Sequence, residues 1–210
     1  TRLNPLESKK QLDSLRVRKT DKIDAEKLAM SQFILNRKPS YVQEALYQEL
    51  RDLSRFYQNL TEDIVCAKNR LHKVLQITFP ELENILSAPT GEQYWNLVIT
   101  FPCNSFVLES DDATLTAIIR QSTAKRISEK RVTYLVDKLT KLANQSYCAV
   151  KKTSPVIEEV KYYAGELLRL SEHRQGVVEE MVTLAQSLPE YEILLSIPGI
   201  AETTATSIIG

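Results

Sequence analysis

Two aspartates near the start of the chain, Asp21 and Asp24, have a type and spacing suited to binding a metal ion. On a helix, residues three positions apart share a face, with roughly 5–6 Å between their Cβ atoms. Two carboxylates at that distance can hold one divalent cation such as Mg²⁺, which prefers oxygen ligands. The alternative is structural, because Thr20 is a good N-cap and acidic residues in the first helical turn favourably oppose the helix dipole. The spacing alone does not separate the two interpretations.

Lysines and arginines concentrate in two parts of a chain whose net charge is zero. Residues 1–38 contain 10 Lys and Arg against 5 Asp and Glu, and residues 125–152 contain 8 against 2. Local charge determines where a protein contacts a polyanion, so we expect nucleic-acid contacts here. The alternative is that acidic and basic segments neutralise each other in the fold. A basic strip at residues 68–73 is a further candidate contact, and its alternative is a solvated helix surface. The candidate contacts are Arg18, Lys19, Lys68, Arg70, Lys73, Lys125, Arg126, Lys130 and Arg131.

A Pro-Gly turn lies between two apolar segments, in the order Ser196-Ile197-Pro198-Gly199-Ile200. This pattern has the form of a helix-hairpin-helix module, in which backbone N–H groups at a helix N-terminus approach a phosphate closely. Gly199 and Thr203 are therefore candidate phosphate contacts. A packing turn between two helices, without any ligand, is the alternative interpretation.

Regular apolar spacing predicts two long helices that must position these candidates. The first seam runs from about Tyr41 to Ile77 in alternating steps of four and three, and the second runs from Val156 to Leu188 with Arg174 interrupting it. A heptad pattern held over about four repeats is typical of a coiled coil. The two helices could pair as an antiparallel hairpin within one chain, which we favour, or with another subunit. Arg174 at a core-type position would cost stability unless it is paired, although such a residue can also set the register.

The sequence therefore predicts an all-α fold with long antiparallel coiled-coil helices. Residues 41–80 form the first of these helices, residues 81–152 a small helical insertion, residues 153–188 the second helix, and residues 189–210 the start of a helix-hairpin-helix. Within the insertion, Asp111-Asp112 indicates a helix start and residues 128–144 present one apolar face. Cys66, Cys103 and Cys148 have no metal-ligand spacing and are interpreted as free thiols. The sequence contains no Walker loop, dinucleotide fingerprint or nucleophile elbow, so nucleotide cofactors are not indicated.

The order of motifs resembles the DEDD-type insertion-sequence transposases of bacteria, which are related to pilin-gene invertases. The resemblance implies that residues 1–40 are the C-terminal end of an RuvC-like catalytic domain in which four acidic residues bind divalent metal. Asp21 and Asp24 match the last two of the four, and the other two would precede Thr1. A transposase domain with a nucleophilic serine would lie beyond Gly210, so we expect an internal fragment that is inactive alone. The matching residues are Asn4-Pro5, Lys19-Thr20-Asp21-Lys22-Ile23-Asp24-Ala25, Leu28-Ala29, Lys68-Asn69-Arg70-Leu71-His72, Phe79-Pro80-Glu81-Leu82 and Ser196-Ile197-Pro198-Gly199-Ile200.

The same resemblance implies a function and a set of partners. The expected function of the full-length enzyme is Mg²⁺-dependent DNA strand cleavage and rejoining during insertion-sequence mobility, in the bacterial cytoplasm. DNA and a structured guide RNA are the implied nucleic-acid partners; no membrane partner is expected, and the coiled coil is expected to support a homo-oligomer. The alternative function is a non-catalytic coiled-coil scaffold with a helix-hairpin-helix contact to nucleic acid. One departure concerns the family turn, which usually reads Pro-Gly-Ile-Gly, because Ala201 holds the second Gly position and would weaken phosphate contact if a positive φ were needed there.

Overall fold

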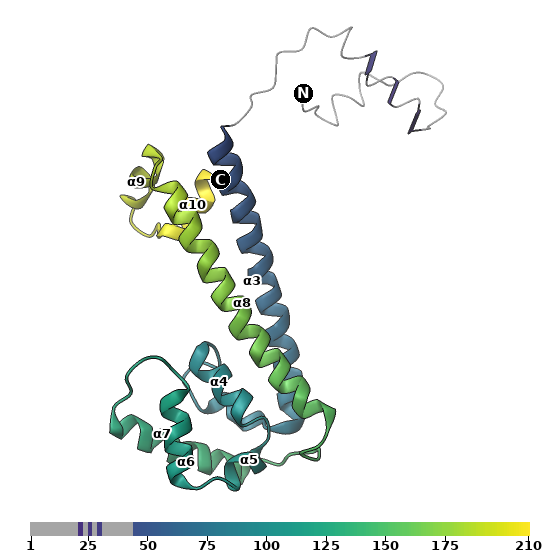
Figure 1. The fold of residues 1–210 in the computed structure, drawn as a ribbon, viewed down its shortest axis with the longest axis vertical. Helices are drawn as coiled ribbons and strands as arrows, with labels where there is room; N and C mark the ends of the chain where they lie inside the picture. Colours follow the sequence, from purple (N-terminus) through teal and green to yellow (C-terminus); the bar gives the residue numbers. More distant parts are fainter. Residues whose placement is uncertain (1–20, 23–24, 27–28, 31–43) are drawn as a thin grey trace. The chain divides into compact units, whose positions relative to one another are not determined.

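The structure is a computed structural model that describes residues 21–22, 25–26, 29–30 and 44–210 (Figure 1). The chain divides into two units, residues 1–45 and residues 46–210. All regular secondary structure in the described ranges is helical, and none of it is strand. The all-α prediction is therefore confirmed, and the second unit provides nearly all of the structural detail.

Two long helices, α3 (Ala45–Thr78) and α8 (Pro155–Ala185), run antiparallel beside each other in Figure 1. The rings of Phe56 on α3 and His173 on α8 meet edge to face, with their centroids 5.5 Å apart. Both helices bury an apolar stripe in one shared core, because residues three and four apart lie on one side of a helix. The buried apolar residues are Leu50, Leu60, Ile64, Ala67, Leu71, Val74 and Leu75 from α3, and Ile157, Val160, Ala164, Leu167, Leu170, Val177, Met181 and Ala185 from α8.

Most positions of the two predicted seams are buried, and the remainder are half-buried. Helix α8 begins with Pro155 in its first turn, and the Ser154 hydroxyl accepts a hydrogen bond from the Val156 N–H at 3.3 Å. Arg174 is half-buried, forms no ion pair with any described residue, and lines a cleft together with Lys68. The antiparallel arrangement is thus a property of one chain, while knobs-into-holes packing between α3 and α8 stays a prediction.

The segment between the long helices folds into one 3₁₀ helix and four short α-helices. Helix α4 packs on α8, while α7 packs on α5, α6 and η1. Tyr94, Trp95 and Phe101 contribute the bulk of its buried aromatic surface. Helix α6 is capped by the Asp111 carboxylate, which accepts from the Thr114 N–H at 3.3 Å, as the sequence suggests. The elements are η1 (Pro80–Asn84), α4 (Glu92–Thr100), α5 (Asn104–Leu108), α6 (Asp112–Gln121) and α7 (Glu129–Gln145).

Two further short helices, α9 (Pro189–Leu195) and α10 (Glu202–Ile209), follow α8 and pack against each other. Helix α10 also packs on α8. The start of α3 is tied to this pair, because the Arg51 Nε donates to the Gly210 carbonyl at 2.9 Å and the Tyr47 hydroxyl donates to the Glu190 carboxylate at 3.2 Å. The second unit therefore carries the insertion at one end of the α3–α8 pair and the α9–α10 pair at the other (Figure 1).

Candidate nucleic-acid interface

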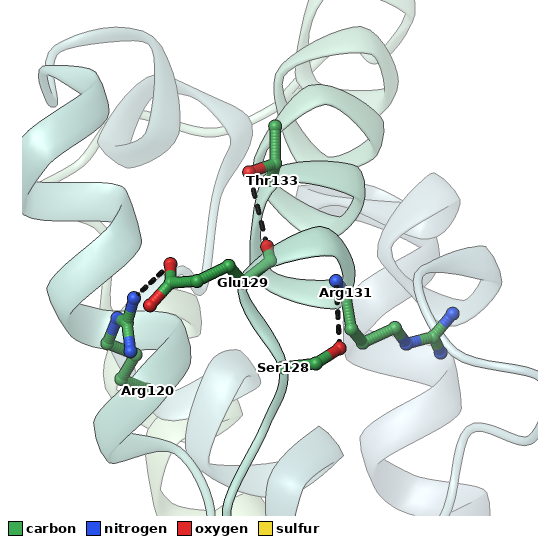
Figure 2. A network of polar contacts seen from close by, with 5 residues as sticks. All are labelled: Arg120, Ser128, Glu129, Arg131 and Thr133. Atoms are coloured by element: carbon green, nitrogen blue, oxygen red, sulfur yellow. Dashed lines mark hydrogen bonds and ion pairs between the residues drawn. The ribbon is translucent and has the colours of Figure 1, made fainter.

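The N-terminal end of α7 carries an ordered polar network, drawn in Figure 2. Ser128 is the N-cap, and its hydroxyl accepts a hydrogen bond from the Arg131 N–H at 3.4 Å. The Glu129 carboxylate forms an ion pair with Arg120 of α6, and the Thr133 hydroxyl donates to the Glu129 carbonyl at 3.2 Å. Figure 2 shows the Arg131 guanidinium pointing away from the Arg120–Glu129 pair. The network fixes the helix start while leaving Arg131 available for other contacts.

Four of the predicted cations, Lys125, Arg126, Lys130 and Arg131, lie at or just before this helix start and are exposed. None of them forms an ion pair with a described residue. Positive charge near a helix N-terminus opposes the macrodipole and disfavours the helix by about 0.3–1 kcal/mol. Lys130 and Arg131 in the first turn of α7 therefore do not stabilise that helix through its dipole.

The structure does not bring the three predicted cations of α3 together. Successive residues of a helix are rotated by about 100°, so Lys68 and Arg70 point in nearly opposite directions. Lys68 is half-buried and lines a cleft of about 660 Å³ with Trp95 and Arg174, whereas Arg70 and Lys73 are exposed. The strip predicted from sequence is therefore two separate surfaces.

The Pro-Gly turn lies between α9 and α10, and Gly199 adopts a φ of 91° there. This left-handed conformation favours glycine. Ala201 is the N-cap of α10 with φ −92° and ψ 166°, so the second Gly position needs no positive φ and alanine fits it without strain. Thr203 is half-buried, and its carbonyl accepts from the Thr206 hydroxyl at 3.0 Å. Glu202 already places a negative charge in the first turn of α10, which competes with a phosphate for this helix end.

Asp21 is exposed and lies in a helical segment of the first unit. Asp24, Arg18 and Lys19 lie outside the described residues. In the part of the chain that the structure describes, no group of three or more His, Cys, Asp or Glu residues could hold a metal ion. An exposed carboxylate at Asp21 fits as one ligand of a hard cation, but the described residues alone do not complete a site.

A comparison with protein families gives residues 2–80 a match to a transposase family model, the DEDD transposases of the IS110 type. Over these residues the chain is similar to the IS110-type transposases, and the match supports the resemblance stated from the sequence. No curated protein and no solved structure matches the chain.

The matched region includes Asp21, Asp24 and all of α3, and it ends at Pro80, the first residue of η1. The insertion, α8, α9 and α10 therefore lie outside the match. A transposase acts on DNA, so DNA is the partner implied by the family. No helix in residues 44–210 or in the short described segments before them is long and apolar enough to cross a membrane.

One exposed aromatic residue was missed by reasoning from sequence. Tyr134 lies on α7 with half of its surface in solvent, and the Arg131 guanidinium carbon is 5.3 Å from its ring centroid. The available signal was its spacing, three residues after Arg131 and four before Lys138, which places all three on one side of α7.

Proposed function

We propose that the chain serves metal-dependent DNA strand cleavage and rejoining, with Asp21 and Asp24 supplying two of the metal-binding carboxylates. The observation that carries the proposal is the transposase family match, because it spans both aspartates. The exposure of Asp21 on a helical segment supports the proposal further, because a metal ion and the DNA must both have access to the carboxylate that binds the metal.

Mg²⁺ is the metal we propose, because it prefers carboxylate oxygen and is usually bound by one or two carboxylates together with substrate phosphates. When bound, it would stabilise negative charge on the reacting phosphate. Asp21 and Asp24 would hold that ion, together with the other acidic residues that the family resemblance implies.

Metal binding can be measured on the 210-residue chain with Mn²⁺ as a paramagnetic probe. We expect Mn²⁺ to broaden the NMR signals of residues around Asp21 and Asp24 first, and only weakly, because two carboxylates make an incomplete site. Asp21→Asn should abolish this preference, whereas the matched change Asp63→Asn, at an exposed aspartate of α3, should leave it intact. If Mn²⁺ broadens the same NMR signals equally in the Asp21→Asn variant and in the wild type, the proposed ligand role of Asp21 is contradicted.

The exposed cations at the start of α7 are proposed to contact the nucleic-acid backbone. Each phosphate contact contributes about 0.9 to the dependence of log affinity on log salt for duplex DNA. Replacing Lys125, Arg126, Lys130 and Arg131 by Gln should therefore lower the salt slope by about 2–4 and weaken binding.

The control for this experiment changes Lys161 and Arg169 to Gln, since both already form ion pairs on α8, with Glu158 and Glu166. We expect a change in slope below about 1 for the control. An unchanged slope in the four-cation variant would assign these residues to a solvated face without a partner.

The second candidate function is a non-catalytic scaffold that binds nucleic acid. It is favoured by the α3–α8 pair, which carries the insertion and its basic α7 region without needing a metal. An assay of DNA strand cleavage separates the two functions: cleavage that is lost in Asp21→Asn supports the transposase, and binding without cleavage supports the scaffold. The transposase proposal includes three further features. These are a guide RNA as a second nucleic-acid partner, assembly of several copies through the long helices, and a location in the bacterial cytoplasm.

A further inference from the structure

One face of α7 combines an exposed aromatic ring with three cations. Arg131, Tyr134, Lys138 and Lys141 are spaced by three, four and three residues, which places them in one row along the helix. The opposite face of α7 is buried through Val132, Leu135, Val136, Leu139 and Ala143. Tyr134 therefore contributes little to the core, and half of its side chain reaches solvent.

Two of these cations lie beside the Tyr134 ring. The Arg131 guanidinium carbon lies 5.3 Å and the Lys138 Nζ 5.9 Å from the ring centroid, within the range of cation–π attraction. Lys138 is fixed in turn, because its Nζ donates a hydrogen bond to the Ile85 carbonyl at 3.1 Å. Contacts that restrict the ring before binding reduce the conformational entropy lost when a ligand stacks on it.

A cleft of about 430 Å³ adjoins the ring and is lined by Tyr134, Asp137, Lys138, Lys141, Leu142 and Gln145. This volume falls within the usual range of ligand pockets, about 300–1,000 Å³. Three cations against the single Asp137 carboxylate leave the row with a net positive charge, which complements a phosphate backbone.

We propose that this row binds unpaired nucleotides, with one base stacked on Tyr134 and the flanking phosphates contacted by Arg131, Lys138 and Lys141. A positively charged surface that tracks the backbone, together with an aromatic ring that stacks a base, is how proteins bind single strands without regard to sequence. In a duplex the bases already stack on each other, so Tyr134 gains nothing from it. The inference rests on the proposed contact between the α7 region and nucleic acid, and it adds the kind of nucleic acid that this helix selects.

The test measures binding of the 210-residue chain to three labelled oligonucleotides by fluorescence anisotropy: single-stranded DNA, single-stranded RNA of the same sequence, and the DNA duplex. Stacking of one base contributes about 1–3 kcal/mol, so Tyr134→Ala should weaken binding of the single strands by about 5- to 150-fold. Tyr134→Phe retains the ring and should bind within about twofold of wild type. Which single strand binds more tightly identifies whether DNA or RNA is the source of the unpaired bases.

Two controls separate stacking from charge. Tyr162→Ala removes another exposed tyrosine, on α8, and should leave all three affinities unchanged. Lys141→Gln should lower the salt slope for single strands by about 0.7, whereas Tyr134→Ala should leave the slope unchanged.

Equal losses for single strands and duplex in Tyr134→Ala, or no loss at all, would overturn the stacking proposal. If the four-cation variant still loses binding in that case, the nucleic-acid contact of α7 stands and only the stacking fails. Circular dichroism melts of each variant verify that the fold is retained, as expected for changes at exposed positions.

Discussion

Asn104, the first residue of α5, fixes the C-terminal end of α7. Its side chain is 9% exposed, and its Nδ2 donates hydrogen bonds to the carbonyls of Ala143 at 3.1 Å and Ser146 at 2.7 Å. The last carbonyls of a helix have no partner within the helix, so they need donors from elsewhere. Asn104 supplies two of these donors from a different helix.

Replacing Asn104 by Ala leaves both carbonyls without their donor. One net hydrogen bond contributes about 0.5–1.5 kcal/mol, and a buried acceptor left without a partner costs about 1–3 kcal/mol. The two bonds together therefore predict a loss of about 2–4 kcal/mol in the free energy of unfolding. For a unit of this size, each kcal/mol lowers the melting temperature by about 2–4 °C, which gives a drop of about 5–15 °C.

Thermal melts followed by circular dichroism test this prediction. Asn104→Asp has nearly the same shape but replaces the donor by a carboxylate oxygen, so it should be at least as destabilising as Asn104→Ala. Asn144→Ala is the matched control, because Asn144 is exposed and its Nδ2 donates only within its own helix, to the Thr140 carbonyl at 2.9 Å. We expect it to change stability by no more than about 0.5 kcal/mol. A melting temperature of Asn104→Ala within about 1 °C of wild type would refute the capping role.

Two further predictions concern a thiol and a turn. Burial, together with hydrogen bonding to Cys103, raises the pKa of Cys148 to about 11, so its reactive thiolate is scarce at neutral pH. Iodoacetamide should therefore modify exposed Cys66 first, and the modification rate of Cys148 should still rise between pH 8 and 10. Equal modification rates of Cys66 and Cys148 at pH 8 would contradict the burial of Cys148. Gly199→Ala should lower the free energy of unfolding by about 1–3 kcal/mol because of the positive φ at that position, whereas Ala201→Ser should raise it by about 0.5–2 kcal/mol by adding an N-cap side chain. Thermal melts measure both changes, and a stable Gly199→Ala variant would show that the turn adopts another conformation.

Helices and their starts could be predicted from sequence because the signals are local. The Asp111 cap, the Ser128 cap and Pro155 in the first turn of α8 each depend on residues within a few positions along the chain. The buried stripes of α3 and α8 follow from helical periodicity in the same way.

Contacts between distant residues could not be predicted in this way. The Asn104 cap joins positions about 40 residues apart in sequence, and the hydrogen bond from Arg51 to Gly210 joins residues near the first and the last positions of the second unit. Local pattern does not specify which helix lies beside which, so these partners appear only in the fold. The apolar face predicted for residues 128–144 packs on the core, with Leu142 half-buried and Val136 and Ala143 buried.

The candidate site shows the same limit. Residue type indicated the cations at the start of α7, and helical rotation alone separates Lys68 from Arg70, but the cleft that Lys68 lines with Trp95 and Arg174 depends on how α3, α4 and α8 pack. The relaxed geometry of Ala201 could not be predicted either, since its φ depends on how the turn enters α10. Asp21 and Asp24 came from spacing and from family resemblance, and their metal-binding role stays a proposal.

The central claim is tested most directly by DNA strand cleavage with the enzyme encoded by the open reading frame that contains this chain, in the presence of Mg²⁺. Asp21→Asn and Asp24→Asn should each lower the cleavage rate by about 10²-fold or more while leaving DNA affinity intact, because electrostatic stabilisation at the reacting phosphate is lost. Asp63→Asn should cleave at the wild-type rate. Wild-type cleavage by Asp21→Asn would contradict the account.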